Sequence, residues 1–294
     1  MASVSVGVCA YNEEKNILSS LRSLMGQREE GFSLKDIVVV SSGSTDRTDD
    51  MVLEVSRSDE RIRLLRQERR EGKNSAVNLF LSQAQGDVCV LVNADNTLEP
   101  DSLTKLLAPF SDLTVGMAGG RPVPTNDKGT VSGFAVHMLW DMHHRLSLLY
   151  PKVGELVAFR NLGITLPTTM QSDEDIMRME LEKKGLRTVY VPEAIVHNKG
   201  PTTVRDFLKQ RTRVNIGEQY MKRIYDYDIP TWNPRWLFQS YLGFLRDNSR
   251  ELPRTIAAMS LEAYARIYAM LYVKMDRGDK AVWSQVSSTK DVGK

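Results

Sequence analysis

Residues 88–96 read Val-Cys-Val-Leu-Val-Asn-Ala-Asp-Asn, an apolar run that ends in a short polar segment. The apolar part has the length and composition of a buried β-strand, and the residues after it suit a loop. Alternate residues leaving a strand point the same way, so Asn93 and Asp95 face one side. Their oxygen atoms are ligands of the kind that Mg²⁺ or Mn²⁺ prefers. The same segment is also typical of an ordinary turn, and by itself it does not distinguish a turn from a metal-binding loop.

Strand-like and helical segments alternate on both sides of this stretch. Strands are expected at 4–9, 37–40, 62–65, 88–92 and 115–118, and helices at 14–25, 44–57, 75–84 and 100–109. This alternation predicts an α/β fold with a mostly parallel sheet flanked by helices. After Pro124, longer helices are expected at 132–149, 173–184 and 203–224, with strands at 156–159 and 188–191. Two further helices end near Val273.

Composition places the chain among ordinary globular proteins, with 41% hydrophobic and 26% charged residues. The net charge of +2 does not indicate a nucleic-acid partner. Residues 200–294 nevertheless hold 16 Lys and Arg against 10 Asp and Glu. In the helices beyond residue 226, basic residues alternate with apolar and aromatic ones. That pattern suits either packing on other helices or contact with an anionic membrane surface.

Several features predict a cytoplasmic protein. Cys9 and Cys89 lie in apolar strand-like runs, which argues against a disulfide framework. The first residues show no secretory signal pattern. Glu262 and Arg266 interrupt the apolar stretch 255–273, which is too polar to be identified as a membrane span. If the C-terminal helices bind lipid, we expect a peripheral position on the inner face of the membrane.

Three polar loops follow strands of the expected sheet. They are residues 10–14 (Ala-Tyr-Asn-Glu-Glu), residues 41–46 (Ser-Ser-Gly-Ser-Thr-Asp) and residues 93–96. In an open α/β sheet, ligands bind at the carboxyl ends of the strands. We therefore expect these loops to gather at one edge of the sheet and to form a binding site.

Together with further motifs, the loops resemble the family 2 nucleotide-sugar glycosyltransferases of the GT-A fold, over roughly residues 3–217. The resemblance rests on the order of VCAYNEE (8–14), VVSSGSTDRT (39–48), GK (72–73) with Asn78, GD (86–87), VNAD (92–95), SDED (172–175), VPEA (191–194) and QRTR (210–213). It implies a GT-A catalytic domain over residues 1–225. Within it, residues 1–124 would bind the nucleotide sugar and residues 125–225 the acceptor. A helical tail, residues 226–294, would follow.

The resemblance implies roles for individual residues. The nucleotide-binding set is Ala10, Tyr11, Glu13, Ser41, Ser42, Ser44, Lys73, Asn78, Asn93 and Ala94. Asp95 and His197 would bind the metal ion, Mg²⁺ or Mn²⁺, although a single histidine near a strand end is often structural. Gln210 and Arg213 would hold the donor diphosphate or the acceptor. Glu155 and Arg160 flank the strand 156–159 and either face the acceptor or form an exposed ion pair.

The acidic cluster Asp173, Glu174 and Asp175 would supply the catalytic base. Asp173 also suits the N-cap of the helix that follows, and Glu174 its first turn. Asp175 is the second residue of an acidic pair that resembles the family's Glu-Asp motif. We therefore favour Asp175 as the base.

Three features depart from the family pattern. The family usually has acidic residues at the positions of Ser41 and Ser42, so a preference for uridine is not implied. Asn93 replaces the first Asp of the metal motif, and because an amide is a weaker ligand, more of the coordination falls on Asp95. Val214 stands where processive members have Trp, which argues against synthesis of long polymers.

The sequence thus predicts a metal-dependent, inverting glycosyltransferase, a hexosyltransferase with a UDP- or GDP-linked donor. The acceptor hydroxyl would belong to a lipid-linked molecule, a glycan or a small molecule. A sugar nucleotidyltransferase is one alternative, but it would have a Gly-rich loop ending in Arg where this chain has residues 11–14. A non-catalytic nucleotide-binding or scaffold protein is the other, and it would need neither Asp95 nor the acidic cluster.

Overall fold

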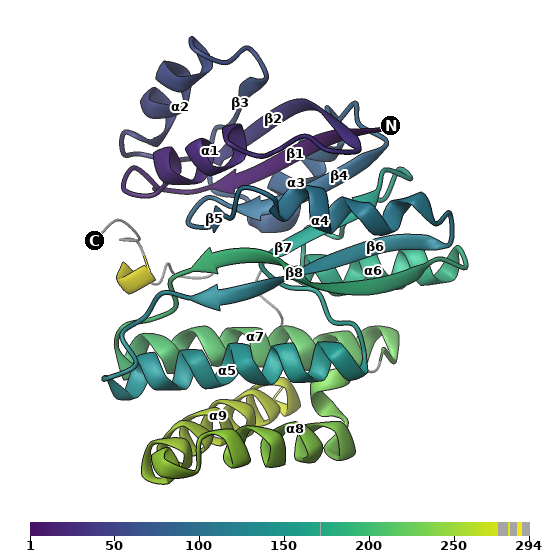
Figure 1. Cartoon of the computed structure of the whole chain (residues 1–294). Helices are drawn as coiled ribbons and strands as arrows, with labels where there is room; N and C mark the ends of the chain where they lie inside the picture. The colour runs from purple at the N-terminus through teal and green to yellow at the C-terminus, as the bar shows by residue number, and fades with distance from the viewer. Residues whose placement is uncertain (171, 228, 276–281, 283–286, 290–294) are drawn as a thin grey trace.

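The computed structural model describes residues 1–170, 172–227, 229–275, 282 and 287–289 (Figure 1). The strands are β1 (Ala2–Ala10), β2 (Phe32–Ser42), β3 (Ile62–Gln67), β4 (Val88–Asn93), β5 (Thr97–Leu98), β6 (Val115–Pro124), β7 (Leu156–Arg160) and β8 (Arg187–Asn198). The α-helices are α1 (Ile17–Met25), α2 (Thr48–Ser56), α3 (Lys73–Leu81), α4 (Ser102–Leu107), α5 (Val131–Leu149), α6 (Asp173–Lys183), α7 (Val204–Tyr225), α8 (Pro234–Asp247) and α9 (Leu252–Lys274). Short 3₁₀ turns lie at Ala108–Ser111, Pro230–Trp232, Ser249–Glu251 and Ser287–Thr289.

Within the described residues, the strands form one eight-stranded sheet in the order β3-β2-β1-β4-β7-β6-β8-β5. The four strands from β3 to β4 run parallel. β7 is antiparallel to both β4 and β6, whereas β6 and β8 are parallel and the short β5 is antiparallel to β8. The predicted α/β fold is confirmed, and beyond β4 the sheet is mixed rather than parallel.

Helices cover both faces of the sheet because the apolar residues of each strand alternate between the faces. On one face, α1, α2 and α4 pack against the β1 residues Val4, Val6 and Val8. On the other face, α3 and α6 pack against Cys89 and Leu91 of β4. The β-α alternation of the first 120 residues therefore produces a layer of helices on each side.

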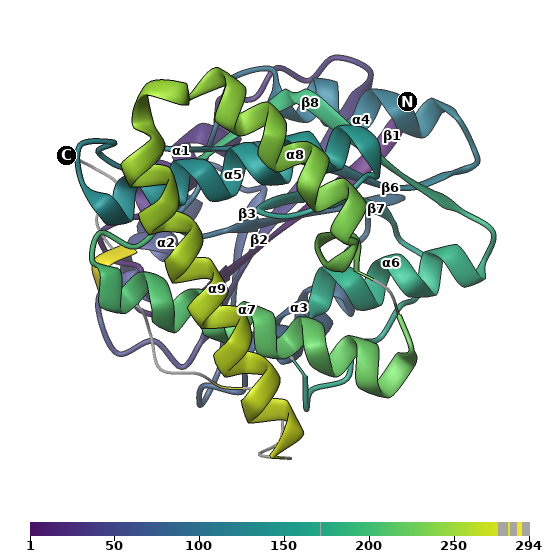
Figure 2. The same ribbon diagram turned by 90° about the horizontal axis from the view of Figure 1, so that it is seen from below.

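The C-terminal helices lie below this sandwich. α5 and α7 run side by side under the sheet, and α8 and α9 lie across them (Figures 1 and 2). The ring of Phe244 on α8 meets that of Phe134 on α5 edge to face, at 6.2 Å. Ala269 and Val273 of α9 belong to the same hydrophobic core as α3, α6 and α7. The segment predicted as a tail therefore shares its core with the predicted catalytic domain. None of the described helices has the length and apolar character needed to cross a bilayer.

A buried charge network joins α9 to α7. The guanidinium of Arg211 on α7 donates to both oxygens of Glu262 on α9, at 2.8 and 3.0 Å. Nε of Arg266 donates to the same carboxylate at 2.9 Å. Glu262 is only 7% exposed. The two charged residues that interrupt the apolar stretch of α9 therefore point into the protein.

The helix predicted at 44–57 begins only at Thr48. The residues before Thr48 are held as a loop because the backbone N–H of Thr45 donates to Oδ1 of Asn12 at 2.8 Å. Oδ1 of Asp46 then accepts from the N–H of Thr48 at 3.0 Å, which satisfies the first turn of the helix. The short strand β5 was not predicted, because a two-residue strand has no periodicity of its own.

Glu262→Gln tests the energetic role of the network. It leaves the buried Arg211 and the half-buried Arg266 without the carboxylate that both of them bind, so we expect the free energy of unfolding to fall by about 3–5 kcal/mol. The matched control is Glu251→Gln, because Glu251 makes an exposed ion pair with Arg254 at 3.2 Å. That pair should be worth less than about 1 kcal/mol. Urea unfolding measures both variants, and equal losses would contradict the role assigned to burial.

Candidate active site

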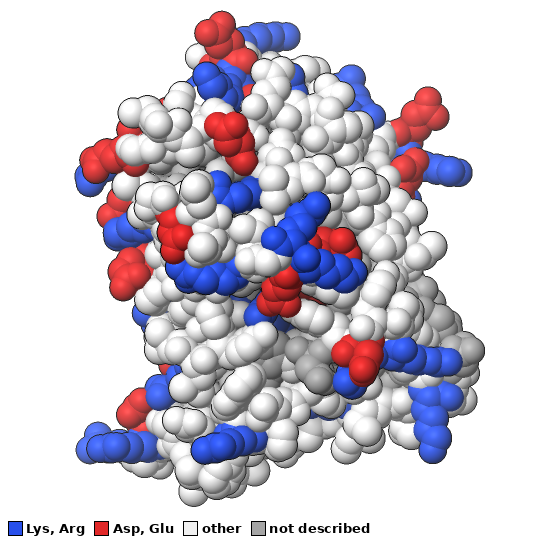
Figure 3. Space-filling model, turned by 90° about the vertical axis from the view of Figure 1, so that its right-hand side faces the viewer, with Lys and Arg blue, Asp and Glu red and all other residues white. Residues whose placement is uncertain are grey.

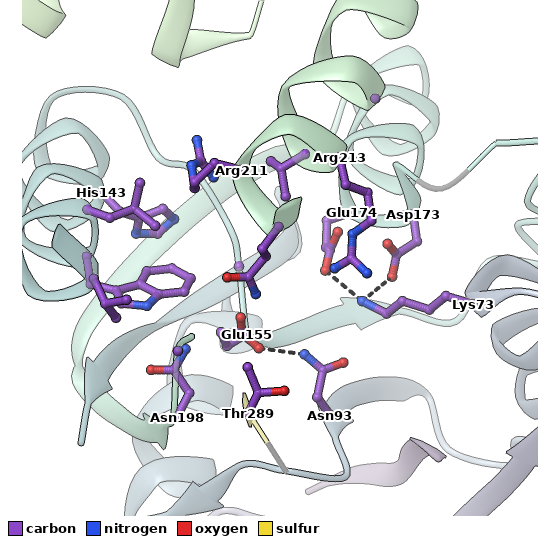
Figure 4. A pocket seen from close by; sticks show the side chains of 18 of the residues that line it. Lys73, Asn93, His143, Glu155, Asp173, Glu174, Asn198, Arg211, Arg213 and Thr289 are labelled. Atoms are coloured by element: carbon purple, nitrogen blue, oxygen red, sulfur yellow. Dashed lines mark hydrogen bonds and ion pairs between the residues drawn. The ribbon is translucent and has the colours of Figure 1, made fainter. Parts of the chain in front are cut away.

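The carboxyl ends of β1, β2 and β4 border a cavity of about 510 Å³, which α5, α6 and α7 close on the other side (Figure 4). Most of the predicted site residues line it: Ala10, Tyr11, Glu13, Ser42, Lys73, Asn93, Ala94, Asp95, Glu155, Asp173, Glu174, Asp175, Gln210 and Arg213. These residues come from segments up to two hundred positions apart, which only the fold brings together.

Hydrogen bonds hold the loops after β1 and β2 together. Asn12 has a left-handed backbone with φ of 53°, a conformation that Asn adopts more readily than most residues. Its N–H donates to Oγ of Ser44 at 3.1 Å. The N–H of Glu13 donates to Oγ1 of Thr48 at 2.7 Å. The two loops therefore form one wall of the cavity, which carries Tyr11 and Ser42.

The same wall lies against the segment that precedes α3. Gly43 has φ of +69°, and a Cβ there would come within 2.7 Å of the backbone of Arg69, so only glycine fits. The close approach puts the guanidinium of Arg70 over the ring of Tyr11, 4.2 Å from its centroid. Arg70 lines the cavity and was not predicted. The sequence signal for it is the Arg pair just before Gly72 and Lys73.

Lys73 contacts two of the three clustered acids. Its Nζ lies 2.8 Å from Oδ2 of Asp173 and 3.0 Å from Oε1 of Glu174 (Figure 4). Burial and repulsion by Glu174 raise the pKa of Asp173 to about 8. For Glu174, burial is outweighed by the Lys73 ammonium, so its pKa is lowered. Lys73 thus contacts both carboxyl groups, and Glu174 is the one held in its charged form.

Asp175 has a different environment. It lines the cavity, and no hydrogen bond from a described residue reaches its carboxylate. Burial raises the pKa of Asp175 to about 6, although the nearby ammonium of Lys152 acts in the opposite direction. The ammonium of Lys152 is itself bound to Glu218 at 2.7 Å. A carboxylate with a pKa near neutrality and no direct partner is suited to accept a proton.

Asp95 and Glu155 form a second acidic group. Nδ2 of Asn93 donates to Oε2 of Glu155 at 2.5 Å, and Nδ2 of Asn96 donates to the same oxygen at 3.1 Å. Burial and the negative charge of Glu155 raise the pKa of Asp95 to about 7. The positive charges of Lys73 and Arg213 offset this rise only in part. Two carboxylates that repel each other in a buried site are stabilised by a cation.

The donor set around Asp95 fits a Mg²⁺ or Mn²⁺ ion that is shared with phosphates. The available ligands are oxygens, which these ions prefer. Among the described residues, no group of three or more His, Cys, Asp or Glu could hold a metal ion. Mg²⁺ is often bound by one or two carboxylates and takes its other ligands from substrate phosphates and water. The site therefore suits a cation that arrives with a diphosphate.

Three predicted nucleotide-binding residues do not line the cavity but support its walls. The hydroxyls of Ser41 and Ser44 bond each other at 2.9 Å. The side chain of Asn78 donates to the carbonyl of Leu166 and accepts from its N–H, each at 2.8 Å. This pair of bonds ties α3 to the loop after β7, which leaves the Asn78 amide engaged away from the cavity.

Arg160 and His197 also lie outside the cavity lining. Arg160 donates to the backbone carbonyls of Val115 and Phe110, at 2.8 and 3.0 Å, and thereby ties the end of β7 to the start of β6. His197 is on β8, and its Nε2 lies 3.3 Å from a carboxylate oxygen of Glu99. The partners of Arg160 and His197 are distant in the sequence, so the sequence pattern does not reveal them.

A second wall of the cavity was not predicted. It is built by α5, α7 and α8 and includes Val136, Leu139, Trp140, His143, Phe207, Leu237 and Tyr241. The rings of Trp140 and His143 meet edge to face at 5.3 Å. Burial lowers the pKa of His143 to about 3, so its imidazole is neutral at physiological pH. Figure 4 shows His143 across the cavity from Lys73, so the site has an aromatic side and a charged side.

Thr289 of the C-terminal segment also lines the cavity, near Asn93 in Figure 4. No motif marks it, and the same holds for the residues of the second wall, because single apolar or small residues carry no pattern of their own.

Comparison with known proteins identifies the family. Residues 5–171 match the family described as Glycosyl transferase family 2. An N-acetylglucosaminyltransferase of Sinorhizobium fredii is 25% identical, over 72% of this chain and 56% of its own length. The poly-beta-1,6-N-acetyl-D-glucosamine synthase of Staphylococcus aureus is 24% identical, over 70% and 52%. The chain thus spans about half the length of the curated relatives that it matches.

The fold has a counterpart among solved structures. A mannosyltransferase from Pyrobaculum calidifontis, in complex with GDP-Man and Mn²⁺, superimposes with a TM-score of 0.65 at 21% identity. The superposition covers 94% of this chain and 88% of that one. The predicted GT-A type of fold is thereby confirmed. The matched family segment covers more than half of the sequence and includes the loops after β1, β2 and β4. The chain belongs to glycosyl transferase family 2.

Proposed function

We propose that the protein transfers a sugar from a UDP- or GDP-linked donor to an acceptor hydroxyl, with a divalent cation and with inversion at the anomeric carbon. One observation carries the proposal: a single cavity holds a metal-suited acidic pair, several cations and a separate carboxylate with no direct partner. The names of the relatives support the donor class, because they describe N-acetylglucosamine transfer and a complex with GDP-Man and Mn²⁺.

The donor occupies the charged side of the cavity. Tyr11, Glu13 and Ser42 hold the nucleoside, and Lys73 and Arg213 face the diphosphate. Asp95, with Asn93 and Glu155 beside it, would hold Mg²⁺ or Mn²⁺. When bound, the cation neutralises the charge that develops on the leaving diphosphate. His197 is not included in the metal site, because its ring contacts Glu99 outside the cavity.

Asp175 acts as the base. The acceptor hydroxyl attacks C1 of the donor sugar, its proton moves to the Asp175 carboxylate, and the bond from C1 to the diphosphate oxygen breaks. The nucleoside diphosphate leaves with the electron pair. Attack on the face opposite the leaving group inverts C1. Asp173 and Glu174 are unsuited to this step because Lys73 already binds both of them.

The acceptor occupies the aromatic side. Asp175 and His143 both experience the charges of Lys152 and Glu218, so they lie in the same part of the cavity. The neutral imidazole of His143 lines the cavity and offers a ring nitrogen to a hydroxyl-bearing molecule. A lipid-linked molecule, a glycan and a small molecule all present such groups.

The donor site is tested by calorimetric titration of UDP and of GDP, each with and without Mn²⁺. We expect one nucleotide to bind in a Mn²⁺-dependent manner, and Asp95→Ala to weaken that binding at least tenfold. Asp50→Ala, which changes an exposed Asp on α2, is the matched control and should bind as the wild type does. Absence of binding to a folded sample would contradict this donor site and favour a non-catalytic role.

Asp175→Asn tests the base. General base catalysis contributes roughly 10²–10⁴-fold, so we expect the rate of donor turnover to fall by about that factor. Nucleotide affinity should stay unchanged, because the cations that face the diphosphate are untouched. The readout is release of nucleoside diphosphate from the nucleotide sugar, with water as the acceptor. Wild-type turnover by this variant, with loss of turnover in Asp173→Asn, would move the role to Asp173.

The pH dependence of turnover gives an independent test. A base must be deprotonated to act, and the pKa of Asp175 is about 6. The rate should therefore rise about tenfold per pH unit below pH 6 and level off above pH 7. Lys152 lowers this pKa, so Lys152→Met should move the profile to higher pH. A profile that is flat between pH 5 and 7, or a shift to lower pH, argues against Asp175.

A further inference from the structure

The middle of α9 has its charged residues turned inward and large apolar residues turned outward. Between residues 255 and 273 the charged residues are Glu262 and Arg266, and both bind within the network around Arg211. The outward positions carry large apolar or aromatic side chains, each 43–62% exposed: Ile256, Tyr264, Ile267, Tyr268, Met270, Leu271 and Met275. A helix that faces water has the opposite arrangement.

α8 continues this surface. Phe238 and Leu242 are 65% and 52% exposed, whereas Phe244 is buried and Tyr241 lines the cavity. Both helices lie on the underside of the molecule, where no other described element covers them (Figure 2). We call this surface the α8–α9 face, defined by Phe238, Leu242, Leu252, Ile256, Tyr264, Ile267, Tyr268, Met270, Leu271 and Met275. Contiguous exposed apolar residues of this kind mark a site of interaction.

Basic side chains surround the α8–α9 face. The exposed residues Arg235, Arg246, Arg250 and Lys274 have no acidic partner among the described residues. The acids of these helices are engaged, since Asp247 pairs with Arg145 at 2.6 Å, Glu251 pairs with Arg254, and Glu262 is buried. In the side view of Figure 3, the lower part of the molecule is mostly free of charged side chains, with Lys and Arg projecting at its margins.

We propose that the α8–α9 face rests on an anionic lipid bilayer. The apolar side chains enter the interface between headgroups and acyl chains, and the surrounding Arg and Lys side chains meet the lipid phosphates. The charge pattern favours this occupant over a second copy of the chain, because a two-fold contact through the same face would bring the basic margins together. The helices lie on the bilayer rather than across it, since their inner sides are packed on α5 and α7.

The same helices place the cavity next to the bilayer. Their inner sides contribute Leu237, Tyr241, Glu262 and Arg266 to its lining. The cavity is therefore about one helix diameter, 10–12 Å, from the α8–α9 face. In combination with the proposed function, this position favours an acceptor that is presented at the membrane surface.

The experiment is flotation of the intact chain with vesicles of phosphatidylglycerol and phosphatidylcholine, and with vesicles of phosphatidylcholine alone. The test variant is Ile267→Asp with Leu271→Asp, which puts two charges in the middle of the face. The matched control is Leu113→Asp, because Leu113 is an 80% exposed residue that precedes β6. Urea unfolding and nucleotide binding are measured on the same samples.

We expect the wild type and the control to float with the anionic vesicles, and the double variant to lose at least tenfold in binding with no change in unfolding. Arg246→Gln with Arg250→Gln should remove the preference for anionic over neutral vesicles. Failure of the wild type to bind, or equal binding by the double variant, would overturn the proposal. If light scattering shows that the wild type is a dimer and the double variant a monomer, the face belongs to a contact with a second copy instead. Nucleotide binding reports on the donor site separately, so the two proposals fail independently.

Discussion

The ammonium of Lys73, in contact with the carboxyl groups of Asp173 and Glu174, ties the start of α3 to the start of α6 at the cavity. Lys73 begins α3, next to the loops after β1 and β2, and the two acids begin α6, a hundred residues later. Burying a charge is unfavourable unless the charge is paired. Separating α3 from α6 would leave these charges unpaired, which costs free energy. The position of the cavity beside the starts of these two helices depends on this pairing.

The need for a compensating partner also distinguishes Asp95 and Asp175 from the two acids that contact Lys73. The negative charges of Asp95 and Glu155 are only partly compensated, and no hydrogen bond from the described part of the chain reaches Asp175. A buried carboxylate whose charge has no compensating partner is available to a ligand. Binding of the ligand then lowers the free-energy cost of burying that charge. The arrangement thus separates acids that hold the fold from acids that are open to chemistry.

Charge compensation also sets the orientation of α9. Arg211 binds Glu262 and turns that side of the helix inward, although most of its other residues are apolar. This buried ion pair fixes the rotation of α9 about its own axis. Ile267, Leu271 and their neighbours are therefore exposed. The same contact forms part of the cavity lining, so the outer surface and the interior of the site are coupled through one helix.

The α/β alternation, the three polar loops and the family motifs could be predicted from the sequence, because periodicity and short motifs are properties of neighbouring residues. Tyr11, Asp95 and Asp175 were predicted in this way and line the cavity. The direction of an individual side chain relative to distant elements depends on packing, which no local pattern contains. For this reason Arg160 and His197 lie elsewhere, and the places of Arg70 and Trp140 in the cavity lining became visible only in the fold.

The C-terminal helices show this division most clearly. From the sequence, Glu262 and Arg266 interrupt an apolar stretch, and packing and lipid contact suit the pattern equally well. In the tertiary structure Glu262 is buried against Arg211 and Arg266 binds Glu262, so the stretch is apolar on its outer face. The sequence by itself determined that these helices are amphipathic. Only the tertiary structure decided which side faces outward, because the partner of the charged side lies fifty residues away on α7.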